Sequence, residues 1–202
     1  MPRPTNRTER RQQIVDGLRL VMAERGFDGA SVASIARRAG LAPGLVHYHF
    51  GSKREILLAL VDALAAQLAE REARLQSAAT DPWSRLDAWI NAHLALGDDA
   101  DPSAVACWVA IGAEATRAAD VRAAYESAVT TDLDRAEELV TAVLAEQLGP
   151  DAVGPARTVA TALLAAIEGC YRLASGAPGA VAPGFAAPSV RAMARGLIGG
   201  PS

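Results

Sequence analysis

Two histidines, a tyrosine and the only lysine of this 202-residue chain stand close together at His47, Tyr48, His49 and Lys53. Imidazole and phenol groups donate and accept hydrogen bonds, and an ammonium group is a point charge for phosphate. On a helix His47 and His49 would diverge by roughly 200°, so they cannot share a metal ion as residues four apart can. The chemistry we expect here is hydrogen bonding to polar groups and pairing of one positive charge with an anionic group such as phosphate, with no metal site.

A short helix is predicted just before this group. Ser31 is a natural N-cap, and the spacing of Ile35 and Ala36 places apolar side chains on one face. Gly40 ends this helix, and Pro43 suits the opening turn of the next one because its missing N–H would have no partner there. Two short helices joined by a tight turn are typical of a helix-turn-helix that reads DNA.

The second helix, over residues 43–50, should have one buried and one exposed side. Val46 and Phe50 are four apart and can anchor one side in a core. Gly44, His47 and Tyr48 are then left to point outward. Gly44 allows close approach of the backbone, and His47 can donate to a guanine or accept from an amino group, depending on its tautomer.

This part of the chain resembles the DNA-binding signature of the TetR-type repressors. The resemblance covers about the first quarter of the chain and is carried by several residue types at fixed spacing, namely Ile35-Ala36 through Gly40, Pro43-Gly44, Tyr48-His49-Phe50 and Ser52-Lys53. It implies contacts with double-stranded DNA by Ser31, Pro43, Gly44, Leu45, His47, Tyr48, His49 and Lys53.

The resemblance also implies a division of roles among these residues. Tyr48, His49 and Lys53 are expected at phosphates, whereas Pro43, Gly44 and His47 are expected in the major groove. The chain departs from the family at two places, because Ala42 stands where Ser or Thr commonly caps the second helix and Leu45 where Thr is frequent. Both changes remove hydroxyl groups, which affects the target sequence rather than the mode of binding.

The charge of the chain is divided unevenly. The overall net charge of −3 argues against a nucleic-acid binder, yet residues 1–54 hold ten basic and four acidic residues, a net charge of +6. The remainder therefore carries −9. A basic module on an acidic body suits attraction to phosphate, because the positive field is local. A charged face that is merely solvated is the alternative.

The whole chain is predicted to be all-α, with about nine helices. Half of the residues are hydrophobic but only 4% are aromatic, which favours a helical core rich in Ala and Leu. We expect a three-helix DNA-binding domain over 1–51 and a larger helical ligand-binding and dimerisation domain over 52–202. The expected helices cover about 8–25, 31–39, 43–50, 52–75, 81–93, 120–148, 155–175 and 188–198, with an acidic turn at 97–102 and a Gly, Pro and Ala-rich loop at 176–187. A further helical segment, capped by Asp101 or Ser103, is expected to contain Trp108 and Ile111.

No segment looks like a membrane span or a signal peptide, so we expect a cytoplasmic protein. The apolar stretches are broken by charged or amide residues well before the roughly 18 residues that a span requires. Cys107 and Cys170 lie in apolar surroundings without metal-ligand spacing. Buried free thiols are favoured over a disulfide, with redox sensing as a further alternative.

The larger domain carries residues that could line a cavity for an amphipathic small molecule. For each of them plain core packing is the stronger alternative, although Glu168 stands out as a charge on an apolar helix that would need a cationic ligand or an arginine such as Arg117 or Arg172. The candidate ligand residues are Trp89, His93, Trp108, Tyr125, Glu168 and Tyr171.

Part of this domain resembles a subgroup of the family, the choline-responsive repressors of betaine synthesis. The resemblance rests on Trp108, on Glu114-Ala115-Thr116-Arg117 and on Ile167-Glu168-Gly169, and the ligand is not carried over with it.

The helix over 155–175 is apolar around much of its circumference, which favours burial on two sides. The domain core and a second subunit would satisfy both sides, with the final helix completing a pair that resembles the dimerising four-helix bundle of the family. The candidate dimer residues are Val159, Leu163, Ile167 and Tyr171.

Together these features predict a homodimeric transcriptional regulator. It would be a repressor that binds a palindromic operator and is released from it by a small molecule. An enzyme is the competing class, but the chain has no Ser-His-Asp order, paired carboxylates in an apolar setting, Gly-rich phosphate loop or metal spacing. No catalytic residue, cofactor or metal is therefore expected. A helical interaction module that never touches DNA is the third class, which a salt-dependent gel shift would separate from a regulator.

Overall fold

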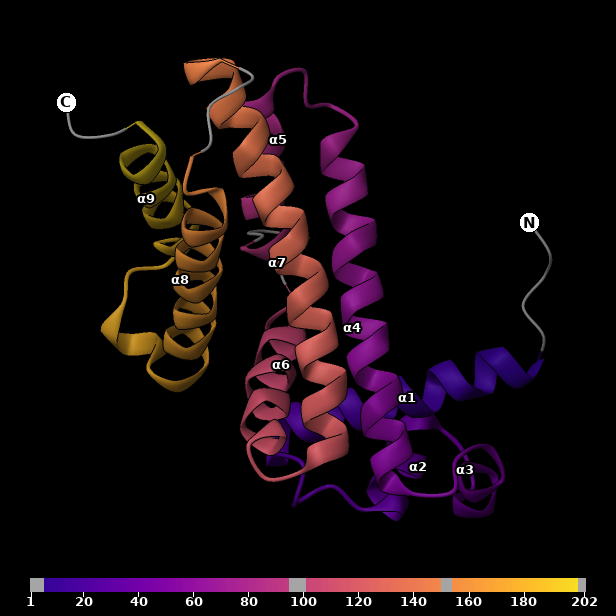
Figure 1. The fold of residues 1–202 in the computed structure, drawn as a ribbon. Coiled ribbons are helices and arrows are strands. Elements are labelled where there is room, and N and C mark those ends of the chain that lie inside the picture. The colour runs from indigo at the N-terminus through magenta and orange to yellow at the C-terminus, as the bar shows by residue number, and fades with distance from the viewer. Residues whose placement is uncertain (1–5, 95–100, 150–153, 200–202) are drawn as a thin grey trace. The chain divides into compact units, whose positions relative to one another are not determined.

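The computed structural model describes residues 6–94, 101–149 and 154–199, and all regular elements in these ranges are helical (Figure 1). The prediction of an all-α chain of about nine helices is confirmed. Most of the acidic turn predicted at 97–102 lies outside the described residues. The helices are α1 (Asn6–Arg25), α2 (Val32–Ala39), α3 (Pro43–His49), α4 (Lys53–Gln76), α5 (Pro82–His93), α6 (Pro102–Ala115), α7 (Ala119–Leu148), α8 (Ala156–Gly176) and α9 (Ala186–Gly199), with a 3₁₀ turn at Pro178–Ala180.

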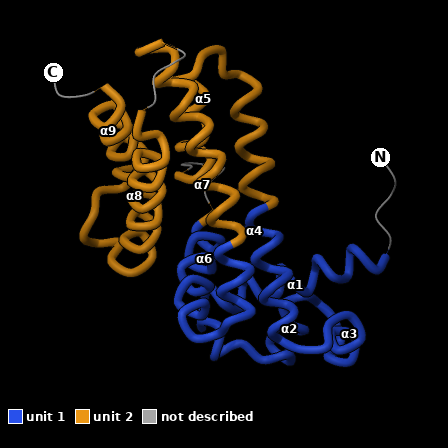
Figure 2. The backbone as a smooth tube through the Cα atoms, viewed as in Figure 1, with its two compact units in different colours: residues 1–65, 102–126 blue, residues 66–101, 127–202 orange. Residues whose placement is uncertain are grey.

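The chain forms two compact units, each built from two separate stretches of sequence (Figure 2). Unit 1 comprises residues 1–65 and 102–126, and unit 2 comprises residues 66–101 and 127–202. Helix α6 and the start of α7 thus belong to the same unit as the helix-turn-helix. The boundary predicted after residue 51 separates a DNA-binding domain from a ligand-binding domain, whereas the two compact units are defined by their internal contacts. The functional boundary therefore stays a prediction.

In unit 1, α2 begins and ends at the residues that the sequence indicated. The Ser31 hydroxyl accepts a hydrogen bond from the Ser34 backbone N–H at 3.1 Å, and the Ser34 hydroxyl accepts one from the Ser31 N–H at 2.9 Å. This reciprocal pair satisfies two N–H groups that the first turn would otherwise leave open. At the other end Gly40 has a φ of 68°, the left-handed conformation that glycine adopts at little cost.

Helix α3 is anchored as predicted. Val46 and Phe50 are buried in the core of unit 1, where α3 packs against α1 and α2. Pro43 lies in the first turn, where no acceptor is needed for its missing N–H. Ala42 occupies the N-cap position and has no side-chain oxygen to offer, so packing rather than capping holds this short helix.

Gly17, in the middle of α1, lies at a close approach of α1 to α2, which helical periodicity does not predict. A Cβ atom at this position would lie 2.8 Å from the backbone oxygen of Ile35 and 3.2 Å from the backbone nitrogen of Ala39. Atoms of a helix backbone cannot move aside as a flexible side chain can. The absence of a side chain at Gly17 therefore sets the spacing between the two helices.

Replacing Gly17 by alanine should consequently destabilise the protein. In an open helix this change is favourable by about 1 kcal/mol, but overpacking against a backbone typically costs about 1–3 kcal/mol, so the net effect on the free energy of unfolding should be unfavourable. Urea denaturation measures it, with Gly44→Ala as control because nothing lies within 4 Å of a Cβ at Gly44. Equal stability of the two variants would contradict the close approach.

Helix α6 packs against α1 within unit 1. Ile111 and Cys107 are fully buried, and the Cys107 thiol donates to the backbone oxygen of Arg19 at 3.1 Å. Arg54, in the first turn of α4, pairs with the buried Glu114 of α6 at 3.1 Å. A shift of α6 would therefore displace its contacts with α1, which packs against α3, and with the first turn of α4.

Unit 2 has its own core, to which α5, α7, α8 and α9 contribute. Asp81 caps α5 by accepting the Ser84 N–H at 2.9 Å. Cys170 of α8 is buried here, so both cysteines are free and buried as expected, and burial raises the pKa of the Cys170 thiol. No helix in the described ranges is long and apolar enough to cross a membrane.

Helix α8 is two-faced, which changes the assignment of its apolar residues. Val159, Leu163 and Ile167 are 4%, 0% and 0% exposed because they pack in the core of their own unit. Side chains already covered within one chain have no surface to offer to a second subunit. The opposite face carries small or polar residues, and Leu173 is exposed near its end.

Candidate nucleic-acid interface

The outer face of α3 presents the side chains that the sequence assigned to a groove. Tyr48 is 77% exposed and Leu45 is 37% exposed. Pro43, Gly44 and His47 are exposed as well, and no atom lies within 4 Å of a Cβ built at Gly44. An apolar side anchored in the core and an accessible polar side are what a recognition helix requires.

His49 faces the other way. Its side chain is buried in unit 1, and its ring stands edge-on to that of Tyr48, with 5.1 Å between the centroids. The backbone oxygen of His49 accepts a hydrogen bond from Arg11 at 2.6 Å, which ties the end of α3 to α1. A phosphate contact by the His49 side chain stays a prediction, and the accessible hydroxyl next to it belongs to Tyr48.

Lys53 is held inside unit 1 by backbone oxygens. Its ammonium group donates to the carbonyls of Phe27 and Ala30, both at 2.8 Å, and lies 4.2 Å from the centroid of the Phe27 ring. Two of its three N–H donors are thus used to join the start of α4 to the turn after α1. Any phosphate contact, which also stays a prediction, would have to use the remaining donor.

Lys53→Met should therefore lower stability even without DNA. Methionine keeps an apolar stem of similar length but leaves two partly buried carbonyl oxygens without this donor, which costs about 1–3 kcal/mol. Urea denaturation at neutral pH measures the loss. Arg38→Gln is the control, because it removes only an exposed ion pair with Glu24, for which under about 1 kcal/mol is expected. Equal midpoints for Lys53→Met and the unmodified chain would contradict the role assigned to these contacts.

The candidate ligand residues fall into two groups, one in each unit. Trp108 of α6 and Tyr125 of α7 form a tilted aromatic pair in unit 1, with 4.9 Å between the ring centroids. Both are half-buried. Opposite them, a Cβ at Gly112 would lie 3.3 Å from the Tyr125 hydroxyl, so the small residue makes room for the phenol.

The second group forms a partly buried hydrogen-bond network in unit 2 around Asp132 of α7. The indole N–H of Trp89 donates to one carboxylate oxygen of Asp132 at 2.9 Å, and Nε2 of His93 lies 2.8 Å from the other. The Tyr171 hydroxyl donates to the backbone oxygen of His93 at 3.1 Å. Sequence reasoning missed Asp132, since a carboxylate on an amphipathic helix is normally solvated. The network joins α5, α7 and α8.

The geometry favours the charged form of His93. Its Nδ1 lies 2.9 Å from the Trp89 carbonyl oxygen and its Nε2 faces the carboxylate, so both ring nitrogens meet acceptors. Only the doubly protonated imidazolium donates to both. Burial lowers the pKa of His93, but the Asp132 carboxylate, the Trp89 carbonyl and the charge of Glu72 together outweigh it, and the pKa is raised above the ordinary value of 6.5.

Glu168 lies on the same helix as Tyr171 and acts on it electrostatically. Burial and then the Glu168 carboxylate raise the pKa of the Tyr171 hydroxyl well above its usual range, so this group is a neutral donor at any physiological pH. Within the described ranges no group of three or more His, Cys, Asp or Glu residues is placed to hold a metal ion.

A helical protein with an anchored, outward-facing recognition helix belongs to the helix-turn-helix class, and comparison with known proteins identifies the family. Residues 14–60 match the model of bacterial regulatory proteins of the tetR family. The HTH-type transcriptional regulator BetI of Burkholderia thailandensis is 30% identical over 174 residues, which cover 85% of this chain and 84% of that protein. The chain belongs to the tetR family of bacterial regulatory proteins.

Other relatives match a shorter stretch. BetI of Rhizobium meliloti (strain 1021) is 34% identical over 122 residues, or 60% of each chain, so this match spans about three fifths of the relative. Among solved structures, a TetR-family regulator from Rhodococcus sp. has a TM-score of 0.78 at 18% identity and covers 94% of this chain and 98% of its own. A regulator from Saccharomonospora viridis in complex with choline has a TM-score of 0.74 at 21% identity, covering 92% and 93%. These two likenesses establish the fold.

Proposed function

We propose that this protein is a DNA-binding transcriptional regulator, a repressor that a small molecule releases from its operator. The observation that carries the proposal is α3, whose inner side is anchored by Val46 and Phe50 while His47 and Tyr48 are exposed on its outer side. The net charge of +6 on residues 1–54 supplies the attraction to phosphate. As an intracellular DNA binder it would act in the cytoplasm, and we propose no enzymatic activity.

The roles at DNA follow from exposure. Pro43, Gly44 and His47 would face base edges in the major groove, where His47 reads a donor or acceptor. Tyr48 would bind a phosphate through its hydroxyl. Leu45 offers an apolar contact of the kind that suits a thymine methyl group. Ser31 already caps α2 through its hydroxyl, so its contribution to binding would be to fix the start of that helix.

The effector site would include Trp108 and Tyr125. Their half-buried rings could stack on a small amphipathic molecule, and the choline complex of the Saccharomonospora viridis regulator supports the idea that this fold accepts one. Trp108 lies on α6, which packs against α1 in the same unit as the recognition helix. A ligand that moves α6 would therefore move the support of α3. Trp89, His93, Glu168 and Tyr171 stay candidates for a ligand site within unit 2, where Trp89, His93 and Tyr171 also take part in the network around Asp132.

Helices α8 and α9 pack against each other in unit 2 (Figure 1). We propose that dimerisation uses the outer faces of these two helices. Large apolar side chains are exposed on both helices, with Leu173 at 42%, Met193 at 50% and Leu197 at 49%. Small residues along the outer face of α8 would let a partner helix approach closely. Two copies related by a two-fold axis would read a palindromic operator.

Selection of bound fragments from the native genome tests the function. A selected fragment should compete for the protein against random DNA, and the logarithm of its binding constant should fall linearly with the logarithm of salt concentration. His47→Ala should cost about 1–3 kcal/mol on that fragment and much less on random DNA, because a base contact is lost only where the base exists. Tyr48→Phe should weaken binding to the selected fragment and to random DNA to a similar extent. Failure to enrich any fragment would exclude a sequence-specific regulator.

A further inference from the structure

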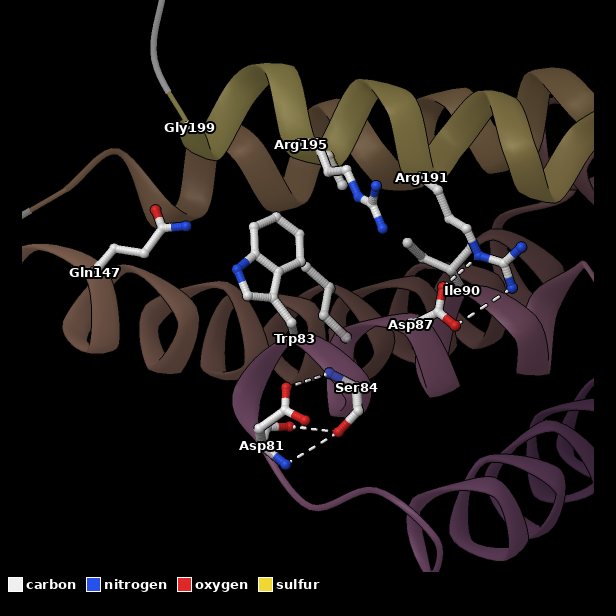
Figure 3. A pocket seen from close by; sticks show the side chains of 11 residues that line it. Asp81, Trp83, Ser84, Asp87, Ile90, Gln147, Arg191, Arg195 and Gly199 are labelled. Carbon is white, nitrogen blue, oxygen red and sulfur yellow. Dashed lines mark hydrogen bonds and ion pairs between the residues drawn. The ribbon is translucent and has the colours of Figure 1, made fainter.

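An open cleft of about 790 Å³ lies in unit 2, lined by α5, the end of α7 and α9, and none of its lining residues is assigned above to DNA or effector (Figure 3). This volume is within the range of ordinary small-molecule sites. Leu86, Ile90 and Ala194 are buried and form its apolar floor, and the half-buried Trp83 ring stands in it. The cleft can therefore hold an apolar or aromatic body.

Three polar side chains of the cleft have unused hydrogen-bonding groups. The guanidinium of Arg195, the indole N–H of Trp83 and the amide of Gln147 make no hydrogen bond or ion pair with any residue that the structure describes, and Figure 3 shows these side chains around the cleft. Arg195 brings a full positive charge with a planar fork of donors that matches a carboxylate.

The two carboxylates of the cleft already have donors. Asp87 accepts hydrogen bonds from Arg191 and from Asn91, and Arg191 also donates to the Asn91 amide oxygen at 2.6 Å. Asp81 is committed to capping α5 through Ser84. A bound ligand must therefore supply hydrogen-bond acceptors for Arg195 and Trp83. A cationic ligand is disfavoured, because Asp81 and Asp87 already accept hydrogen bonds from other residues.

We propose that this cleft binds a small organic carboxylate with an aromatic or aliphatic body, whose carboxylate pairs with Arg195 and whose body packs against Trp83 over the apolar floor. Charge and shape both favour such a ligand. Neither Trp108 nor Tyr125 lines the cleft, so it would be a second ligand site and does not depend on the proposed effector site.

The two sides of α9 make the cleft accessible in a dimer. Arg191 and Arg195 are four apart and share the cleft side, whereas Met193 and Leu197 are four apart and lie roughly 200° away around the helix. A partner covering Met193 and Leu197 would leave Arg195 reachable. A ligand in the cleft would touch the helix that carries the proposed dimer face.

The test measures binding of benzoate, 1-naphthoate and octanoate to the full chain. Calorimetry gives the affinity, and NMR of the indole N–H groups gives the location. The chain has three tryptophans, so three indole signals are expected, and Trp83→Phe assigns that of Trp83. We expect saturable binding of at least one of the three acids, with a shift of the Trp83 signal and none for the buried Trp89. Naphthamide, which lacks the charge, should bind at least about tenfold more weakly than naphthoate.

Arg195→Gln should weaken binding by about tenfold or more, while Arg85→Gln should leave it unchanged. Arg85 is the matched control because it is exposed on α5 and does not line the cleft. Absence of saturable binding by all three acids would overturn the proposal. Binding that is equally tight in Arg195→Gln, or that leaves the Trp83 signal in place, would locate the ligand elsewhere and overturn it as well.

Discussion

Replacing Met193 and Leu197 together by aspartate should produce a folded monomer that has lost its operator affinity. Both side chains are about half exposed in a single chain, so the change costs little in the monomer. In a dimer it would bury two unpaired carboxylates per subunit, which costs several kcal/mol. A single half-site makes too few contacts to hold the protein at physiological salt, so affinity should fall by roughly 100-fold or more. Sedimentation and gel shift on the same samples measure both effects.

Two controls make this prediction specific. Leu148→Asp also places a carboxylate at an exposed leucine, but on α7 outside the proposed face, and this variant should stay dimeric. Ile167→Asp should instead unfold unit 2, because Ile167 is fully buried in its core. A folded monomer from Ile167→Asp, or a stable dimer of the double variant, would place the interface where sequence periodicity suggested rather than on the outer faces of α8 and α9.

Asp132→Ala should be among the most destabilising single changes in unit 2. Removing the carboxylate leaves the buried His93 imidazolium and the Trp89 indole without their acceptor, and breaking such a pair typically costs about 3–5 kcal/mol. Asp132→Asn should destabilise the protein much less than Asp132→Ala. The amide oxygen can accept from Trp89 while the amide nitrogen donates to the Nε2 of a neutral His93, so each group keeps a partner.

The same pair predicts how stability depends on pH. The pKa of His93 is raised in the folded chain above its ordinary value of 6.5, so the folded state binds more protons than the unfolded state over that interval. The stabilisation is fully present below about pH 6.5 and is lost as the pH rises through the raised pKa. Urea unfolding at several pH values between 6 and 9 should show this decline in the unmodified chain, and Asp132→Asn should flatten it. An equal decline in both chains would exclude the His93–Asp132 pair as its source.

The sequence predicted local structure well because caps and breakers act over a few residues. Ser31, Gly40 and Asp81 mark helix boundaries through contacts with neighbours in the chain, and the structure has those boundaries. The anchoring of α3 was equally accessible, since Val46 and Phe50 follow simple helical spacing. The family signature lies in the same short-range pattern.

What the sequence could not predict depends on contacts between distant residues. The partners of Lys53 are backbone oxygens 23 and 26 residues away, and nothing in the local pattern distinguishes such a lysine from one that awaits a phosphate. The apolar circumference of α8 is equally compatible with burial by its own chain or by a second subunit. Gly17 and Asp132 were missed for the same reason, because a close approach or a buried partner becomes visible only once the helices are packed.

Hydroxyl-radical footprinting on a genomic fragment selected by the protein tests most directly whether two copies of α3 read one operator. We predict two protected segments related by two-fold symmetry, with centres about one helical turn of DNA or a multiple of it apart. The Met193→Asp/Leu197→Asp variant should lose both protections together. A single protected segment, or protection that the monomeric variant retains, would contradict the account of a dimer that reads paired half-sites.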